Sequence, residues 1–254
     1  MAANTDITPP VRVPTLRRRM RPTRRISLTV GILYVLTFVS IPTLALYKPI
    51  KDNVDAFILG SGSTSALQWG VLSEIIVGLA GISTAVVLYP LTKRINQTAA
   101  LGLVAARLLE TCLIFVSVVN LLTMTTLRHD LAGTNRGALT TMGHSLLANY
   151  NWTFLLSGSL MPVACDLLLG YLLYKSALVP RIWPIVAFIG APLLLVSDIA
   201  VFFGAYSNVS PIAVLAALPV ALFELSLGIW LIIKGFKPTP LTVQYDAISQ
   251  SPAA

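Results

Sequence analysis

Six long apolar stretches, separated by short polar segments, dominate the hydropathy pattern of this 254-residue chain. Each has roughly 21–25 residues, and about 20 helical residues are enough to cross the hydrocarbon core of a bilayer. The pattern therefore predicts an all-α polytopic integral membrane protein with six transmembrane helices. The predicted spans are 26–46, 67–89, 99–123, 152–174, 183–204 and 212–233.

The flanking and connecting segments have a different composition. Residues 1–25 are rich in arginine and proline, and residues 238–254 are polar, so we expect a disordered basic arm and a disordered tail around a transmembrane domain at 26–237. The two longest connections, 47–66 and 124–150, are expected to be loops, the second with a weak helical pattern over 138–148. Within the first, Gly60 to Ser63 is interpreted as a flexible turn.

Composition supports the membrane interpretation. The chain is 56% hydrophobic and only 11% charged, whereas soluble domains have about 25% charged residues. The net charge of +8 does not indicate a nucleic-acid partner, because the basic residues lie between apolar stretches. In this six-span arrangement, thirteen lysines and arginines fall in the segments on the same side of the membrane as the two termini, and four fall in the connections on the opposite side. This asymmetry predicts that both termini are cytoplasmic.

Few other partners are expected from the composition. The arginine-rich arm is expected to meet anionic lipid headgroups, and the bilayer itself is the main partner. Cys112 and Cys165 both fall inside apolar stretches and are interpreted as small packing residues. We expect no disulfide framework, no metal site and no cofactor. The sequence does not indicate an oligomeric state.

Charged residues inside the apolar stretches carry the functional signal. Arg107 is the only basic residue there, and it lies three positions before Glu110, so that the two share a helix face. A charge at the centre of a bilayer costs about 2.5–3.5 kcal/mol on insertion scales. Each such group therefore needs a partner, a proton or water. The acidic residues are Glu74, Glu110, Asp166, Asp198 and Glu224.

Depth along each span sorts these acids into two groups. At about 1.5 Å per residue, three acids reach the depth of Arg107, and these four residues form a predicted ligand or proton-relay core. Glu74 and Asp198 lie nearer the opposite side from the termini and are predicted to form an outer vestibule. The predicted core is Arg107, Glu110, Glu224 and Asp166.

A short pattern recurs in the second, fourth and sixth stretches, where an acid is followed four residues later by glycine. This spacing puts both residues on one helix face, where glycine permits close helix packing. The pattern indicates three related helix hairpins, and the alternative is coincidence among glycine-rich helices. The pairs are Glu74 with Gly78, Asp166 with Gly170, and Glu224 with Gly228.

Three functional hypotheses follow from these residues. The first is a transporter-like or ligand-binding membrane protein with proton-titratable carboxyl groups, able to take a small molecule or ion. The second is a non-enzymatic scaffold or sensor subunit whose buried ion pair is structural. The third, an intramembrane hydrolase, lacks a histidine inside the apolar stretches, so we assign no catalytic residues and favour a non-enzymatic function.

Several short segments in combination resemble a known family. They are LYPLTKR at 88–94, the Ala-Arg-Leu-Leu-Glu element at 106–110, LVPR at 178–181 and FELSLGIWLIIKGF at 223–236. Over about residues 26–237 the chain resembles the bacterial multi-pass membrane family called domain of unknown function 4386. The resemblance implies a protein of the bacterial inner (cytoplasmic) membrane with six to seven helices. It implies no activity and no site residues.

Overall fold

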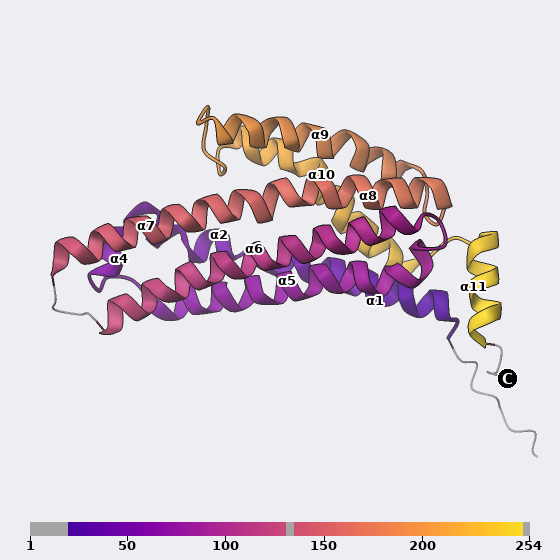
Figure 1. Ribbon diagram of the computed structural model, residues 1–254, viewed down its shortest axis with the longest axis horizontal. Coiled ribbons are helices and arrows are strands. Elements are labelled where there is room, and N and C mark those ends of the chain that lie inside the picture. The colour runs from indigo at the N-terminus through magenta and orange to yellow at the C-terminus, as the bar shows by residue number, and fades with distance from the viewer. Residues whose placement is uncertain (1–19, 131–134, 251–254) are drawn as a thin grey trace, which may run out of the picture.

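The computed structural model describes residues 20–130 and 135–250 of the chain, and every regular element in these ranges is helical (Figure 1). The all-α prediction is therefore confirmed. Most of the predicted basic arm, residues 1–19, lies outside the described residues, as do 131–134 and 251–254. The helices are α1 (Pro22–Thr37), α2 (Thr43–Leu46), α3 (Lys48–Asp52), α4 (Val54–Ile58), α5 (Thr64–Thr92), α6 (Gln97–Asp130), α7 (Arg136–Leu155), α8 (Met161–Ser176), α9 (Ile182–Phe202), α10 (Pro211–Ile233) and α11 (Pro240–Gln250), with a 3-10 turn η1 (Phe38–Ser40) and a π turn η2 (Leu156–Leu160).

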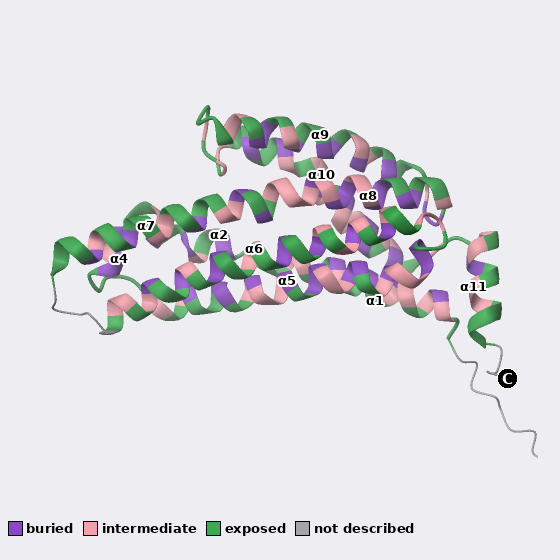
Figure 2. Cartoon of the chain, viewed as in Figure 1, coloured by how far each residue is buried: buried purple, intermediate pink, exposed green. Residues whose placement is uncertain are grey.

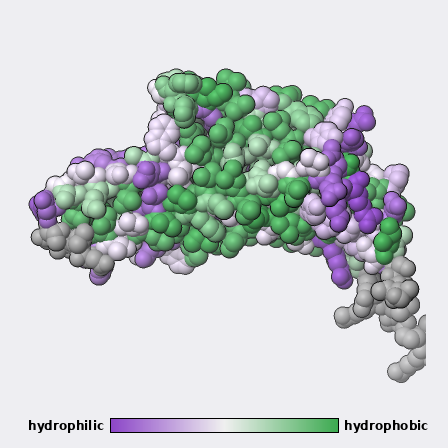
Figure 3. Space-filling view, in the orientation of Figure 1, coloured by the Kyte–Doolittle hydropathy of each residue, from purple (hydrophilic) through white to green (hydrophobic). Residues whose placement is uncertain are grey.

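Within the described residues, five helical segments are long and apolar enough to cross a membrane: α5, α6, the continuous α7–η2–α8 segment, α9 and α10. Hydrophobic side chains cover the middle of the molecule, and hydrophilic ones gather towards its two ends (Figure 3). These features support a multi-pass membrane protein. The first predicted span, 26–46, is not one continuous helix, because α1 ends at Thr37 and is followed by η1 and α2. Pro42 lies at this break, where its ring nitrogen cannot donate a backbone hydrogen bond.

The long helices form a closed ring in chain order. α1 packs against α5, α5 against α6, α6 against α7 and α8, α8 against α9, and α9 against α10. Contacts between α10 and α1 close the ring. Buried residues lie on the helix faces that meet, while the outer faces are largely exposed (Figure 2). The exposed faces are themselves apolar, as expected of helices whose outer solvent is lipid.

The α1–α10 contact that closes the ring depends on glycine. A Cβ atom at Gly31 would lie 2.7 Å from the carbonyl oxygen of Gly228. Conversely, a Cβ atom at Gly228 would lie 3.0 Å from Cβ of Tyr34. A larger residue at Gly31 would require a backbone shift, and one at Gly228 would make a tight contact. Small residues at such positions allow two helices to approach this closely.

The two predicted loops are mostly helical in the structure. Residues 48–58 form α3 and α4, while α6 extends to Asp130 and α7 begins at Arg136. Together with the adjacent ends of α5, α6 and α7, the helices α3 and α4 form a distal lobe, opposite the chain ends (Figure 1). These segments are helical because they bury an apolar core of their own, in which Phe57, Leu121 and Tyr150 are almost fully buried. Helix extension is favoured here because it completes this core.

The described ends of the chain lie together at the other end of the molecule (Figure 1). Residues 240–250 were expected to belong to a disordered tail, but they form the helix α11. The Asp246 carboxylate accepts hydrogen bonds of 2.9 Å from both the backbone N–H and the hydroxyl of Thr23. The Arg94 guanidinium lies 5.0 Å from the centroid of the Tyr245 ring. These contacts stabilise α11 against the first turn of α1 and the α5–α6 connection.

Candidate functional site

The ring of helices encloses a partly open cavity of about 380 Å³. Its lining comes from α1, η1, α2, α5, α6, α7, η2, α8, α9 and α10, so every long helix of the ring contributes. Most of the wall is apolar. Among the described residues that line it, four are charged: one on α5, one on α10 and two on α6. Those four are Glu74, Arg107, Glu110 and Glu224.

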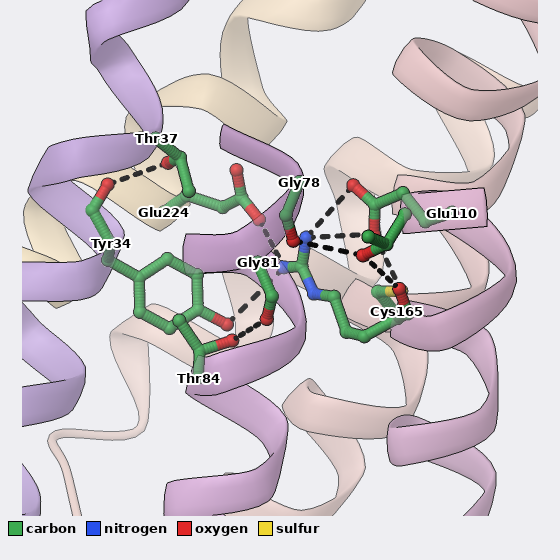
Figure 4. Close-up of polar contacts among 10 residues, drawn as sticks. Tyr34, Thr37, Gly78, Gly81, Thr84, Glu110, Cys165 and Glu224 are labelled. Atoms are coloured by element: carbon green, nitrogen blue, oxygen red, sulfur yellow. Dashed lines mark hydrogen bonds and ion pairs between the residues drawn. The ribbon is translucent and has the colours of Figure 1, made fainter. Parts of the chain in front are cut away.

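Arg107 forms two ion pairs in the cavity wall. Its Nη1 atom lies 3.0–3.1 Å from both carboxylate oxygens of Glu110, one turn further along α6. Its Nη2 atom lies 2.6 Å from Oε1 of Glu224 on α10. Figure 4 shows Glu110 and Glu224 approaching the guanidinium from different sides. Arg107 is 3% exposed, so both pairs are largely shielded from solvent, and the pair with Glu224 links α6 to α10.

Side chains from α1 and α8 surround this ion triad. The Tyr34 hydroxyl accepts a hydrogen bond of 3.4 Å from Nη2 of Arg107, and its ring centroid lies 5.7 Å from the guanidinium. The Cys165 thiol donates to Oε2 of Glu110 at 3.5 Å (Figure 4). The guanidinium is thus contacted from two helices besides its own, α1 and α10, and α8 reaches the triad through Glu110. Tyr34 and Cys165 position the charged groups, with the thiol itself fully buried.

Asp166, the fourth residue of the predicted core, lies behind the triad. It is close enough to Glu224, Arg107 and Glu110 to interact with them electrostatically. It is fully buried, and neither of its carboxylate oxygens has a hydrogen-bond partner in the structure. It does not line the cavity. The structure therefore brings three of the four predicted core residues into direct contact and places the fourth next to them.

The two predicted vestibule residues lie in different surroundings. Glu74 lines the same cavity as the triad, and its Oε1 atom accepts a 3.0 Å hydrogen bond from Tyr150. Its Oε2 atom is buried and has no partner. Asp198 does not line the cavity and instead accepts a hydrogen bond from Ser159 in the π turn. The structure does not bring Glu74 and Asp198 together.

The three glycines of the repeated pattern lie at helix contacts within the ring. A Cβ atom at Gly78 would lie 3.3 Å from side-chain atoms of α6, and Thr111 donates a 2.9 Å hydrogen bond to its carbonyl oxygen. A Cβ atom at Gly170 would lie 3.3 Å from Ala187 and Phe188 on α9, and Gly228 faces α1. Each acid of the pattern is thus followed by a tight helix contact one turn away.

The π turn is a feature that the sequence reasoning missed. It precedes Pro162, which cannot donate a backbone hydrogen bond to the carbonyl of Gly158, and the wider turn accommodates that loss. Ser157 and Gly158 of this turn line the cavity. Such single-turn bulges occur often at functional sites. The available sequence signal for this turn was Pro162, which lies four residues before Asp166 inside an apolar stretch.

Tyr34 and Tyr150 were also missed, although both donate or accept hydrogen bonds with the charged groups. The hint was a phenol within or beside an apolar stretch, which needs a partner when buried. A metal centre is not indicated: among residues 20–130 and 135–250, no group of three or more His, Cys, Asp or Glu side chains could hold a metal ion.

Comparison with known proteins identifies one family model, described as Domain of unknown function (DUF4386), which matches residues 29–235. No curated protein and no solved structure matches the chain. The matched range begins within α1 and ends just after α10, so it covers the ring except for the first part of α1, and it includes every residue that lines the cavity.

Proposed function

The chain belongs to the family described as Domain of unknown function (DUF4386), and we propose that it is a ligand-binding, transporter-like membrane protein. The ligand site is the cavity within the helix ring, and the carboxyl groups of its wall are the proton-titratable elements. The observation that carries this proposal is the position of the ion triad in the wall of a cavity that all the long helices of the ring build together.

The size and lining of the cavity support a small-molecule site. Its volume of about 380 Å³ lies within the range of about 300–1,000 Å³ that is typical of ligand pockets. Like such pockets, it has mostly apolar walls and a few convergent polar groups. A cavity of this kind also separates the protein from a plain helix bundle, in which side chains fill the interior to close packing.

The charges of the wall support a titratable site. Arg107 is one positive charge paired with the carboxyl groups of Glu110 and Glu224, while Glu74 lines the same cavity and Asp166 adds a fourth carboxyl group close to the triad. One guanidinium cannot neutralise four carboxylates, and Lys51, which lies close enough to act on Glu74, adds only one further positive charge. Burial of the surplus negative charge is costly, so we propose that protons or a cationic ligand compensate it. Tyr34 and Cys165 are the other titratable groups that face the triad.

The membrane topology belongs to the same proposal. We propose that α1, η1 and α2 together make a sixth crossing, that both termini are cytoplasmic and that the membrane is the bacterial cytoplasmic membrane. The hydrogen bonds between Thr23 and Asp246 support an even number of crossings, because they join the two described ends. The basic residues support the orientation. The three-hairpin repeat, and the contact of the basic arm with anionic lipid, stay predictions.

A second candidate is a scaffold or sensor subunit whose ion triad is only structural. The pairing of both terminal nitrogens of Arg107 favours it, and the pair with Glu224 bridges α6 and α10. Buried charges can fix helix register in this way. The two candidates differ in whether water-soluble molecules reach the cavity.

Thiol labelling of the cavity tests the proposal. Ser157 lines the cavity and Ser226 of α10 does not, so we would compare Ser157→Cys with Ser226→Cys, both in a Cys112→Ser background, in oriented proteoliposomes. A membrane-impermeant methanethiosulfonate reagent is added to either side. A ligand site predicts labelling of Ser157→Cys from at least one side, and a transporter predicts labelling from both sides. Failure to label it from either side contradicts the proposal and favours the scaffold.

Proton movement provides the second measurement. Proteoliposomes with a trapped pH dye are placed under an imposed membrane potential, with and without a low-molecular-weight cell extract. We expect an extract-dependent proton flux that Glu110→Gln and Glu224→Gln abolish. Asp55→Asn is the matched control, because Asp55 is an exposed carboxylate of the distal lobe that pairs with His144. Equal flux in all variants would remove the triad from the mechanism.

A further inference from the structure

One carboxylate oxygen in the cavity wall has no partner. Glu74 is 7% exposed and lines the cavity, its Oε1 atom accepts the Tyr150 hydrogen bond, and its Oε2 atom is buried without a hydrogen bond. A buried acceptor of this kind is costly unless a donor satisfies it. A ligand that brings a donor to this position would supply the missing partner.

The hydroxyl groups of the wall also present acceptors to the cavity. The hydroxyls of Thr37, Ser40 and Thr43 donate to backbone carbonyl oxygens three residues earlier, at 2.6–3.1 Å. Ser117 donates to the carbonyl oxygen of Leu113 and to Thr153. Each of these four hydroxyl protons is thereby used within the protein, and the oxygen lone pairs remain available as acceptors. The Nε–H of Arg107 is the exception, a buried donor without a hydrogen-bond partner. Acceptors otherwise predominate in the polar part of the wall, which suits a ligand that donates hydrogen bonds.

The charge of the wall excludes an anion as the preferred ligand. The guanidinium of Arg107, the only cation among the described residues that line the cavity, is already paired with Glu110 and Glu224. An anion would find no free positive charge in the wall and would meet the carboxylate of Glu74. Like-charge contact in a low-dielectric site is strongly unfavourable.

The aromatic part of the wall favours a cation. Phe154 lines the cavity, and the Lys51 ammonium lies 5.2 Å from the centroid of its ring and 5.0 Å from that of Tyr150. The chain thus already places one ammonium group over the two rings next to Glu74. Phe38 lines the cavity as well. Aromatic faces attract ammonium groups through the ring quadrupole.

We propose that the cavity takes an organic cation, a protonated amine on an apolar body, with the ammonium at the Glu74 carboxylate and the body against the apolar wall. This inference rests on the proposed ligand site and adds its chemical class. The amine can come from a water-soluble compound or from the headgroup of an amine lipid.

A charge series with one common body tests the class of ligand. The probes are phenethylamine, its neutral analogue phenethyl alcohol and its anionic analogue 3-phenylpropanoate, with binding to the full chain in a maltoside detergent measured by equilibrium dialysis. We expect phenethylamine to bind more tightly than both analogues by about tenfold or more. Glu74→Gln should abolish this preference, whereas Asp55→Asn should retain it. Thermal unfolding of each variant shows that it is folded.

The outcomes separate this inference from the proposed function. Equal or tighter binding of the alcohol or the anion overturns the cation assignment but leaves a ligand-binding cavity. Binding of none of the three probes also overturns the assignment, and Ser157→Cys labelling then decides independently whether the cavity is a site. In nanodiscs, competition by phosphatidylethanolamine identifies a lipid headgroup as the source of the amine. Lack of competition identifies a water-soluble amine.

Discussion

Removal of the Arg107 charge is the perturbation whose consequence the structure defines most sharply. In Arg107→Leu, the carboxylates of Glu110 and Glu224 lose partners at 2.6–3.1 Å while they stay buried, with side chains only 10% and 16% exposed. Breaking one buried pair typically costs about 3–5 kcal/mol. Because two carboxylates lose their partner, we expect a loss of unfolding free energy at or above the upper end of that range.

The recovery pattern distinguishes this triad from a simple pair. Arg107→Leu combined with Glu110→Leu should regain only part of the stability, because Glu224 still lacks a partner. The triple variant with Glu224→Leu contains no uncompensated member of the triad, and we expect it to lie within about 1–2 kcal/mol of the native chain, since apolar replacement of a buried ion group is often neutral.

Sodium dodecyl sulfate titration in mixed micelles measures these differences, with intrinsic tryptophan fluorescence reporting unfolding. The four tryptophans include Trp183 and Trp230, whose ring centroids are 6.5 Å apart at the α9–α10 contact. A loss below about 1 kcal/mol in Arg107→Leu, or a triple variant as unstable as the single one, would refute the reasoning from buried charge.

Three further predictions concern other parts of the molecule. Gly228→Ala should destabilise the α1–α10 contact by about 1–3 kcal/mol through overpacking, whereas Gly102→Ala, whose Cβ would lie 3.5 Å from Leu168, should be neutral or slightly stabilising in the same titration. Asp246→Asn should weaken the cap on Thr23 by about 0.5–2 kcal/mol, and faster hydrogen exchange confined to α11 and the first turn of α1 would show it. Burial lowers the pKa of Lys51, and the nearby Glu74 carboxylate only partly opposes this. The unfolded chain therefore binds the proton more tightly than the folded one, so the native chain should gain stability relative to Lys51→Met as the pH rises towards the ordinary lysine pKa; a difference independent of pH in alkaline titrations would contradict that.

The sequence was sufficient to predict the parts of the site that depend on local spacing. A separation of three residues on one helix places Arg107 beside Glu110. The position of Glu224 along its own apolar stretch places it at the same membrane depth as Arg107. The close-packing glycines followed from a spacing of four. These inferences hold because helix geometry alone relates the residues, whatever the arrangement of the other helices.

Long-range partners could not be predicted in this way. The hydrogen bond from Tyr150 to Glu74 joins residues that are 76 positions apart, and hydropathy carries no information on such pairing. The distal lobe was missed for a related reason: the polar residues after Thr123 lower the mean hydropathy, although Met124 and Leu139 continue the buried face. The π turn and α11 depend on local hydrogen bonds that composition does not specify.

The closed ring has a consequence for biosynthesis. Arg24 donates hydrogen bonds to the carbonyl oxygens of Leu231 and Ile232 at the end of α10, and Arg24 and Leu231 are 207 residues apart. At about 5–20 residues per second, ribosomes need roughly 10–40 s to make the chain between them. During that interval α1 is already synthesised, but α10, which packs against its Gly31, has not yet been made. The first helix must therefore wait at the insertion machinery or in lipid with its glycine face uncovered, and the last helix completes the molecule when it arrives.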